Sequence, residues 1–257
     1  MTDLQQSGVV ITMAGAGSRF VKAGYSVPKY AIEAHGRTLF AWSMHSLRDF
    51  IESGSPFYFV ALATPGIESF IASQCREIGI ASHRITILDA ITDGQATSAK
   101  LAQQQWDDLS RPVAIYNIDT YVNPDALPVR AVRGNGWIPC FPGEGDKWSF
   151  AAADAQGRVM EVREKKRISP HASVGFYWFD SFSRYLDAYE EYYAAAEHLE
   201  ASERYIAPLY NHLIRQGADV FLHEIPAGDV YPLGTPEDVE LFKMRSSPDL
   251  RTLASAR

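Results

Sequence analysis

The chain has 257 residues, 46% of them hydrophobic, which is enough for one large α/β domain with a sizeable core. Its net charge of −7 argues against a nucleic-acid partner. The two cysteines, Cys75 and Cys140, show no ligand spacing, which excludes a disulfide framework or zinc site and favours a reducing cytoplasm.

No targeting or membrane segment is expected. Residues 1–6 have no basic region leading into an apolar run, so they do not resemble a signal peptide. No apolar run approaches the roughly 18 residues that cross a bilayer. We therefore expect a cytoplasmic protein without a membrane partner.

The first half of the chain alternates between strand and helix patterns. Strands are predicted over 8–13, 57–63, 85–88 and 112–118, and helices over 38–52, 67–78 and 97–107. The run 57–63 is apolar almost throughout, which is typical of a strand buried on both faces of a parallel sheet. The alternation predicts a doubly wound α/β sheet.

The second half has shorter strand patterns separated by turns. Strands are predicted over 130–141, within 147–164, and over 172–179 and 220–225; helices are predicted over 182–198, 202–216 and 236–244. The tyrosines of 182–198 have helical spacing, which favours packing or an oligomer contact, so a homodimer is one option. No linker separates the halves, and we expect a single domain over 1–257.

A glycine-rich turn follows the first predicted strand. It consists of Ala14, Gly15, Ala16, Gly17 and Ser18, with Arg19 directly after it and Pro28-Lys29 further on. Glycines without side chains let backbone N–H groups approach a phosphate. Arg19 and Lys29 add two cations where a polyphosphate would lie. The motif predicts a site that holds a nucleoside triphosphate and acts on it.

These residues resemble the signature loop of the nucleotidyltransferases that make sugar nucleotides and related metabolites, including phosphocholine cytidylyltransferases. The family pattern is Gly-x-Gly-(Ser/Thr)-Arg, a spacer, then Pro-Lys, and further similarity extends to about residue 243. The resemblance implies a Rossmann-like nucleotidyltransferase fold with one mixed, mostly parallel sheet. It also implies a nucleotide-binding half at 1–125 and an acceptor-binding half at 126–245.

The implied reaction is attack of a phosphate oxygen on the α-phosphorus of a nucleoside triphosphate, with pyrophosphate leaving. Its barrier is mainly electrostatic, because two anions must meet. By the resemblance, Arg19 holds the departing β- and γ-phosphates and Lys29 lies at the α-phosphate. Taken alone, either side chain would be an ordinary solvated charge.

Asp119 is the candidate magnesium ligand. It follows an apolar strand, at the edge where α/β sheets bind their ligands, and its carboxylate suits Mg²⁺. Asn117-Ile118-Asp119 resembles the family's Gly-Asp motif, with Ile118 in place of glycine. The alternative is a strand-end Asp that begins a turn.

The second magnesium ligand is less defined. Many family members carry Asp in an Asp-(Ile/Leu)-Gly-Thr-Pro segment, where this chain has Pro232. Either Asp229 takes the role, or Mg²⁺ is held by Asp119, phosphates and water. Asp229 could equally be a turn residue.

Asp93, Gly94 and Gln95 resemble the family's second nucleotide-contacting segment. A glycine turn that enters a helix leaves N–H groups pointing outward. Gln95 offers a donor and an acceptor to a base edge. The alternative is a capped helix start, with Thr97 or Asp93 as the cap.

Two further segments resemble the family's acceptor site. By analogy Lys165 binds the acceptor phosphate, Glu164 binds a sugar hydroxyl, and Gly175 lets the acceptor approach the backbone. The alternatives are a solvated charge run and a strand bulge.

The leading hypothesis is a Mg²⁺-dependent nucleotidyltransferase acting on a sugar 1-phosphate or a small alcohol or amine phosphate, for surface polysaccharide synthesis. A catalytically silent nucleotide-binding relative is one alternative. The other is an NAD(P)-dependent Rossmann oxidoreductase, although Phe20 stands where its third glycine would be. The sequence leaves the base and the acceptor open.

Overall fold

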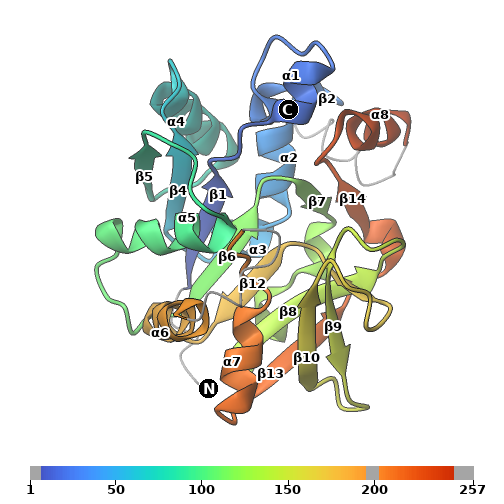
Figure 1. Ribbon diagram of the computed structural model, residues 1–257. Helices are drawn as coiled ribbons and strands as arrows, with labels where there is room; N and C mark the ends of the chain where they lie inside the picture. The colour runs from blue at the N-terminus through green and yellow to red at the C-terminus, as the bar shows by residue number, and fades with distance from the viewer. Residues whose placement is uncertain (1–6, 195–202, 246–257) are drawn as a thin grey trace.

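A computed structural model of the chain describes residues 7–194 and 203–245 (Figure 1). Ten strands form its main sheet: β1 Gly8–Met13, β4 Phe57–Leu62, β5 His83–Leu88, β6 Val113–Asn117, β8 Gly136–Pro142, β9 Ser149–Ala153, β10 Val159–Glu164, β11 His171–Ser173, β12 Phe176–Phe179 and β13 Val220–Glu224. Two small ladders pair β2 Glu33–Ala34 with β3 Arg37–Thr38, and β7 Thr120–Val122 with β14 Val230–Pro232.

The α-helices of the described ranges surround this sheet in Figure 1. They are α1 Ser18–Lys22, α2 Leu39–His45, α3 Arg48–Glu52, α4 Ile67–Ile78, α5 Gln95–Leu101, α6 Phe182–Tyr193, α7 Leu209–Arg215 and α8 Pro236–Met244. None of these helices is long and apolar enough to span a membrane.

The main sheet has two regions of different pairing. Its order is β10-β9-β11-β8-β12-β6-β1-β4-β5, with β13 paired to β8. The strands β6, β1, β4 and β5 are parallel, whereas β12, β11, β9 and β10 pair antiparallel with their neighbours. The predicted α/β sheet is confirmed. Its four adjoining parallel strands come from the first half of the chain, and β13 adds a parallel pairing with β8 in the second half.

Side chains alternate between two cores on either face of the parallel strands. Along β1, Val9 and Ile11 face the core packed by α2, α3 and α4, whereas Val10 faces the core packed by α5, α6 and α7. This period of two is what a strand buried on both faces requires. The burial predicted for 57–63 is confirmed over β4, where Phe57 and Phe59 face one core and Tyr58 the other.

A third hydrophobic core packs the C-terminal elements β14 and α8 near the carboxyl end of β6. It joins α1, α2, β7, β14 and α8 through Phe20, Leu39, Trp42, Tyr121, Tyr231, Leu233, Val239 and Phe242. The backbone N–H of Leu233 donates to the Asp119 carbonyl at 2.7 Å. This core therefore brings residues more than a hundred positions apart to the end of β6.

Two predicted helices of the first half have different bounds in the structure. The helix predicted over 38–52 is divided into α2 and α3, because the backbone leaves the helical region at Leu47, with φ of −101° and ψ of 25°. The helix predicted over 97–107 begins earlier in the structure, at Gln95, and this helix, α5, passes into a 3₁₀ turn over Ala102–Gln105.

Two predictions of the second half were too long. The strand expected from residue 130 begins at Gly136, since Pro128 starts a 3₁₀ turn over Val129–Ala131. Of the helix expected over 202–216, only Leu209–Arg215 is helical, and this helix, α7, follows Pro208. Residue 202, and residues 195–198 of the predicted 182–198 helix, lie outside the described ranges.

Candidate functional site

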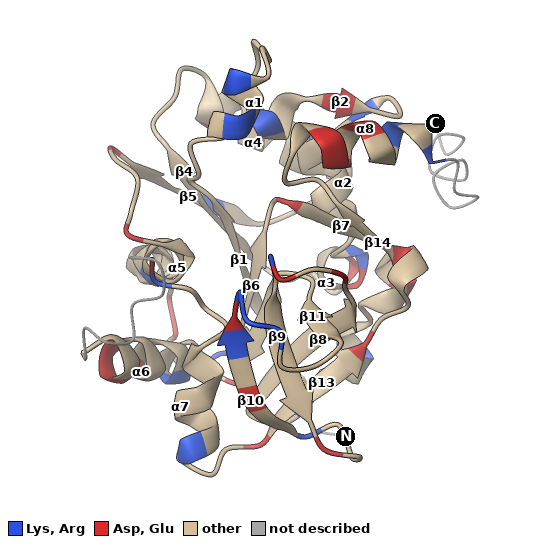
Figure 2. Cartoon of the chain, turned by 45° about the vertical axis from the view of Figure 1, so that its right-hand side comes forward, with Lys and Arg blue, Asp and Glu red and all other residues tan. Residues whose placement is uncertain are grey.

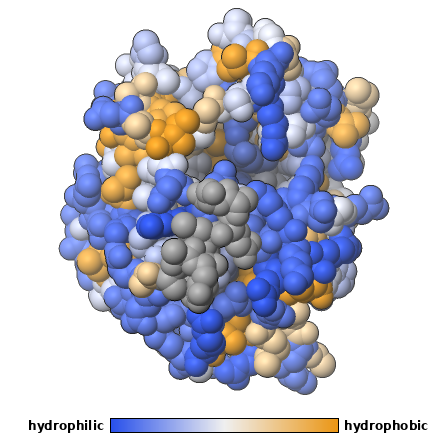
Figure 3. Space-filling model, viewed as in Figure 1, coloured by the Kyte–Doolittle hydropathy of each residue, from blue (hydrophilic) through white to orange (hydrophobic). Residues whose placement is uncertain are grey.

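A cavity of about 760 Å³ opens at the carboxyl ends of β1, β4 and β6. Four loop segments line it: residues 14–17, residues 25–30, residues 91–95 and residues 117–119. Figure 3 shows a recess on this face, beside an apolar patch over α4 and β5. The carboxyl edge of a parallel sheet is where α/β proteins hold their ligands.

The glycine turn forms one wall of the cavity. Ala14, Gly15, Ala16 and Gly17 all line it. Gly17 adopts the left-handed region, with φ of 59°, just before α1. A Cβ built on Gly15 would meet no atom within 4 Å, so the turn borders open space. A phosphate can therefore approach this backbone.

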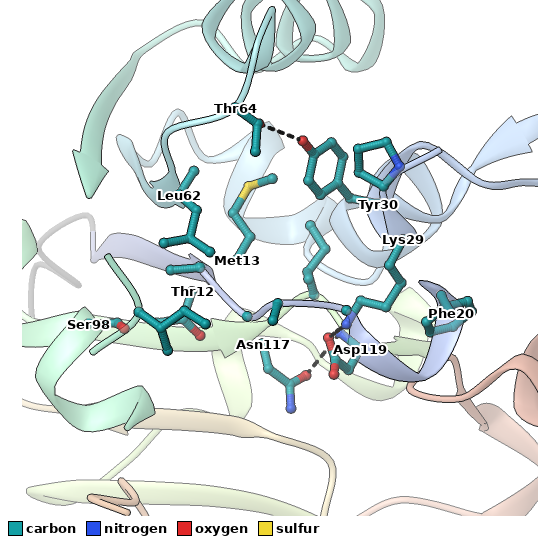
Figure 4. A pocket seen from close by; sticks show the side chains of 18 of the residues that line it. Thr12, Met13, Phe20, Lys29, Tyr30, Leu62, Thr64, Ser98, Asn117 and Asp119 are labelled. Carbon is teal, nitrogen blue, oxygen red and sulfur yellow. Dashed lines mark hydrogen bonds and ion pairs between the residues drawn. The ribbon is translucent and has the colours of Figure 1, made fainter. Parts of the chain in front are cut away.

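Lys29 and Asp119 contact each other at the wall of the cavity (Figure 4). Lys29 begins a 3₁₀ turn after Pro28, and its Nζ donates to Asp119 Oδ1. The Lys29 side chain is 15% exposed and that of Asp119 is 41% exposed. The structure thus brings together two predicted residues that are far apart in the sequence, with the carboxylate still open to a ligand.

Arg19 and Ser18 lie on the first turn of α1, outside the residues that line the cavity. Arg19 is exposed and forms no ion pair with any residue of the described ranges. Figure 2 shows the basic residues of α1 at the top of the molecule. The structure therefore does not bring Arg19 into the cavity lining.

The second glycine turn forms the opposite wall. Asp93, Gly94 and Gln95 line the cavity, and Gln95 Nε2 donates to Thr12 Oγ1 at 3.0 Å. No side chain caps α5, so the capped start is not observed. Thr97 Oγ1 donates to Asp93 Oδ1 instead. Gln95 therefore ties α5 to β1 while its amide borders the cavity.

Gly175 lies behind the cavity. It is buried with φ of 82°, and a Cβ there would lie 2.2 Å from Asn117 Nδ2. Asn117 lines the cavity, and its Oδ1 accepts from the Asp119 N–H at 3.4 Å. Gly175 thus makes room for a side chain that supports Asp119.

Asp229 is separated from Asp119 by the β7–β14 ladder. Its carboxylate accepts from Asn123 Nδ2 at 3.0 Å, at the far end of that ladder. Pro232 pairs with Thr120, directly after Asp119. Asp229 therefore lies opposite Asn123, four residues from Asp119, which is about 13 Å along the ladder at about 3.3 Å per residue. The structure does not bring Asp229 into the cavity.

Asp238 is a nearer carboxylate that the sequence analysis missed. A Cβ on Gly234 would lie 3.7 Å from Asp119 Oδ2 and 3.9 Å from Asp238 Oδ2. Lys147 Nζ lies 3.6 Å from Asp238 Oδ1. The available signal was the Thr-x-x-Asp spacing of a capping box, and the Asp238 N–H does donate to Thr235 Oγ1 at 3.1 Å. That signal indicates a helix start, not proximity to Asp119.

The other two predicted acceptor residues, Glu164 and Lys165, lie at the end of β10, outside the cavity lining. Glu164 is 8% exposed and accepts from Ser149 Oγ. Tyr177 Oη lies 3.3 Å from the same Ser149 hydroxyl. Burial, with the nearby Glu164 charge, raises the pKa of Tyr177, so that this phenol stays protonated. Lys165 is exposed, and its Nζ donates to the Tyr205 hydroxyl.

The donor set at Asp119 fits a magnesium ion that keeps water and phosphate ligands. Within the described ranges, no three His, Cys, Asp or Glu side chains cluster as a complete metal site. Mg²⁺ is commonly held by one or two carboxylates together with substrate phosphates. The half-exposed Asp119 carboxylate meets that need, and the phosphates would come from the nucleotide.

The fold and the cavity define the class of nucleotide-binding α/β proteins, because a glycine turn and a Lys–Asp pair meet at the carboxyl edge of parallel strands. No protein-family model matches the chain, and a search of curated proteins found no match either. Solved structures do match it. The nucleoside-diphosphate-sugar pyrophosphorylase from Vibrio cholerae RC9 is 36% identical, with a TM-score of 0.86 over 92% of this chain and 100% of that chain.

The chain therefore belongs to the nucleotidyltransferase family of the nucleoside-diphosphate-sugar pyrophosphorylases, and it is an enzyme of that class. The suspected family is confirmed, and the oxidoreductase alternative is set aside.

Two more distant structures share the fold. The inositol-1-phosphate CTP transferase from T. maritima is 15% identical, with a TM-score of 0.74 over 98% of this chain and 96% of that chain. The CTP:phosphocholine cytidylyltransferase from Streptococcus pneumoniae is 13% identical, with a TM-score of 0.68 over 93% of this chain and 98% of that chain. Both identities are low, so these structures support the architecture alone.

Proposed function

We propose that this enzyme transfers a nucleoside monophosphate from a nucleoside triphosphate to a small phosphorylated metabolite and releases pyrophosphate. The observation that carries the proposal is the cavity where the glycine turn, the Lys29–Asp119 pair and Gln95 meet. The glycine turn suits a triphosphate, the Lys29–Asp119 pair suits its α-phosphorus, and Gln95 suits a base. Residues 1–125 would bind the nucleotide and residues 126–245 the acceptor.

The chemical step is a displacement at the α-phosphorus. An acceptor phosphate oxygen forms a bond to it, the bond to the bridging oxygen of the β-phosphate breaks, and pyrophosphate leaves with that electron pair. Lys29 would stabilise the charge at the α-phosphate, and Arg19 would move in to hold the departing β- and γ-phosphates. Asp119 holds the Lys29 ammonium at the cavity wall before the nucleotide enters.

Asp119 would hold Mg²⁺ together with phosphate oxygens. The ion, when bound, would neutralise charge on the triphosphate. Asp238, the carboxylate nearest to Asp119 at Gly234, is better placed to support this site than Asp229.

The acceptor is a small polar metabolite that carries a phosphate. Lys165 would bind that phosphate and Glu164 a hydroxyl, whereas the space at the buried Gly175 is taken by Asn117. The similarity to the nucleoside-diphosphate-sugar pyrophosphorylase from Vibrio cholerae supports this chemical class. We further propose a cytoplasmic enzyme that supplies surface polysaccharide synthesis, with a homodimer as one option.

The test is pyrophosphate release with Mg²⁺ for CTP, UTP, dTTP, ATP and GTP, each against a panel of sugar 1-phosphates and small alcohol or amine phosphates. Release with one pair would establish the reaction and name both substrates. Nucleotide binding by calorimetry without release for any pair would favour the silent relative. If the protein neither bound a nucleotide nor released pyrophosphate, that result would contradict the proposal.

A further inference from the structure

Residues 203–206 form a short extended segment between the second glycine turn and the end of β10, and we call it the bridging segment. Glu203, its first residue, lines the nucleotide cavity. The Arg204 N–H donates to the Asp93 carbonyl at 2.8 Å, and the Ala96 N–H donates to the Arg204 carbonyl at 3.0 Å. The bridging segment therefore pairs with the turn by backbone hydrogen bonds on both sides of Gly94.

This pairing explains the glycine of the turn. Gly94 has φ of 147°, and a Cβ there would lie 2.4 Å from both the nitrogen and the carbonyl oxygen of Arg204. Only glycine fits such a contact without moving one of the two backbones. The conformation of the turn thus depends on where Arg204 lies.

The Arg204 side chain holds the same turn through a second set of contacts. Its Nε lies 3.1 Å from Asp93 Oδ2, and its Nη1 donates to the Tyr189 hydroxyl at 2.5 Å. That hydroxyl lies 2.8 Å from Thr97 Oγ1, which donates to the other oxygen of Asp93. A closed ring of polar contacts therefore surrounds the turn that presents Gln95.

The next residue, Tyr205, contacts the proposed acceptor lysine. Its hydroxyl accepts from Lys165 Nζ, and its carbonyl accepts from the Tyr193 hydroxyl at 2.6 Å. Lys165 has φ of 49°, which a residue with a Cβ rarely adopts. Its own N–H donates to the Trp148 carbonyl at 2.9 Å. Tyr205 thus fixes the far end of a side chain whose backbone is already constrained.

We propose that Arg204 and Tyr205 are positioning residues, Arg204 for the turn that receives the nucleoside and Tyr205 for the lysine that receives the acceptor phosphate. This inference rests on the proposed function. Neither residue needs to touch the reacting atoms, because each acts through Asp93 or Lys165. Adjacent residues of one segment then set the binding of two different substrates.

The test compares Arg204→Ala and Tyr205→Phe with Arg84→Ala, a control that removes another ion-paired arginine, bound to Asp107 at the far edge of the sheet. Steady-state kinetics would give kcat and both KM values. Arg204→Ala should raise the KM for the nucleotide about tenfold and should change the KM for the acceptor by less than about twofold relative to the wild type. Tyr205→Phe, which keeps the ring, should raise the KM for the acceptor about threefold to tenfold and leave that for the nucleotide unchanged.

Unchanged KM values in both variants, or equal rises of both KM values in each, would overturn the proposal, since a merely structural role cannot separate the two substrates. Calorimetric titration of the wild type, Arg204→Ala and Arg84→Ala with the nucleotide alone needs no turnover. Weaker binding only in Arg204→Ala supports its role, and equal affinities in all three reject it. A wild type that binds nucleotide but releases no pyrophosphate would count against the proposed reaction and leave the Arg204 comparison valid.

Discussion

The two glycine turns on either side of the cavity each lead into a helix, and they differ in what surrounds them. A Cβ on Gly15 in the first turn would meet no atom within 4 Å, whereas a Cβ on Gly94 in the second would lie 2.4 Å from the Arg204 backbone. The missing side chain at Gly15 leaves space for a ligand. The missing side chain at Gly94 leaves space for the protein itself.

The difference separates two uses of glycine at one site. The first turn is open, with the Lys29–Asp119 pair close by, so substitutions there should alter catalysis and spare stability. The second turn is held by backbone pairing and by Arg204, so substitutions there should alter stability and nucleotide binding together.

The largest effect is expected for Lys29→Ala. Removing a cation that acts on the developing charge costs about 10²–10³-fold in turnover. Pyrophosphate release under saturating substrates measures it, and circular dichroism checks the fold. Lys100→Ala removes a lysine that is also ion-paired, to Glu190 on α6, and should keep near-normal turnover. If Lys29→Ala turned over like Lys100→Ala, Lys29 would have no part in the mechanism.

Asp119→Asn should come next, with turnover reduced by about 100-fold and the activation by magnesium lost, because an amide is a much poorer Mg²⁺ ligand than a carboxylate. Titrating Mg²⁺ against pyrophosphate release provides the measurement. Asp229→Asn is the matched control, since Asp229 is bonded to Asn123 away from the cavity. Loss of magnesium activation in the Asp229 variant, with normal activation in the Asp119 variant, would reverse this assignment.

Gly94→Ala should lower the free energy of unfolding by about 1–3 kcal/mol, because a Cβ cannot fit at that φ against the Arg204 backbone. Gly15→Ala should change stability by less than about 0.5 kcal/mol and still reduce pyrophosphate release, since it fills space intended for phosphate. Urea unfolding of both variants tests the contrast. Equal destabilisation by the two would show that the first turn is also held by the protein.

Much of the fold could be predicted because local patterns and burial agree. The apolar run of β4 predicted a strand buried on both faces, and the period of helix α4 gave its bounds, Ile67–Ile78, directly. Predicted bounds differed where the backbone conformation changes at a single residue. The helix predicted over 38–52 is interrupted at Leu47, where φ is −101° and ψ is 25°, and the spacing of the apolar residues does not report that change.

The same limit applies to the site. Lys29 and Asp119 could each be named in advance because each lies in a recognisable motif, but their contact with each other was not predicted. Asp238 and Arg204 could not, because their proximity to Asp119 and Asp93 depends on how the C-terminal segment and the bridging segment fold back. Asp229 was a reasonable candidate by spacing alone, but the register of the β7–β14 ladder places it beside Asn123.

The smallest effect, and the finest test of the second turn, is expected for Tyr189→Phe. The ring stays buried while the hydroxyl between Arg204 and Thr97 is lost, so stability should fall by about 1 kcal/mol. Tyr25→Phe is the control, because the Tyr25 hydroxyl makes an exposed 3.4 Å contact with Glu240, away from the second glycine turn. If the polar ring holds the turn, hydrogen exchange at Gln95 and Thr97 should be faster in Tyr189→Phe alone. Equal exchange in both variants would mean that backbone pairing with Arg204 is sufficient, and the side-chain contacts around Asp93 would then have no positioning role.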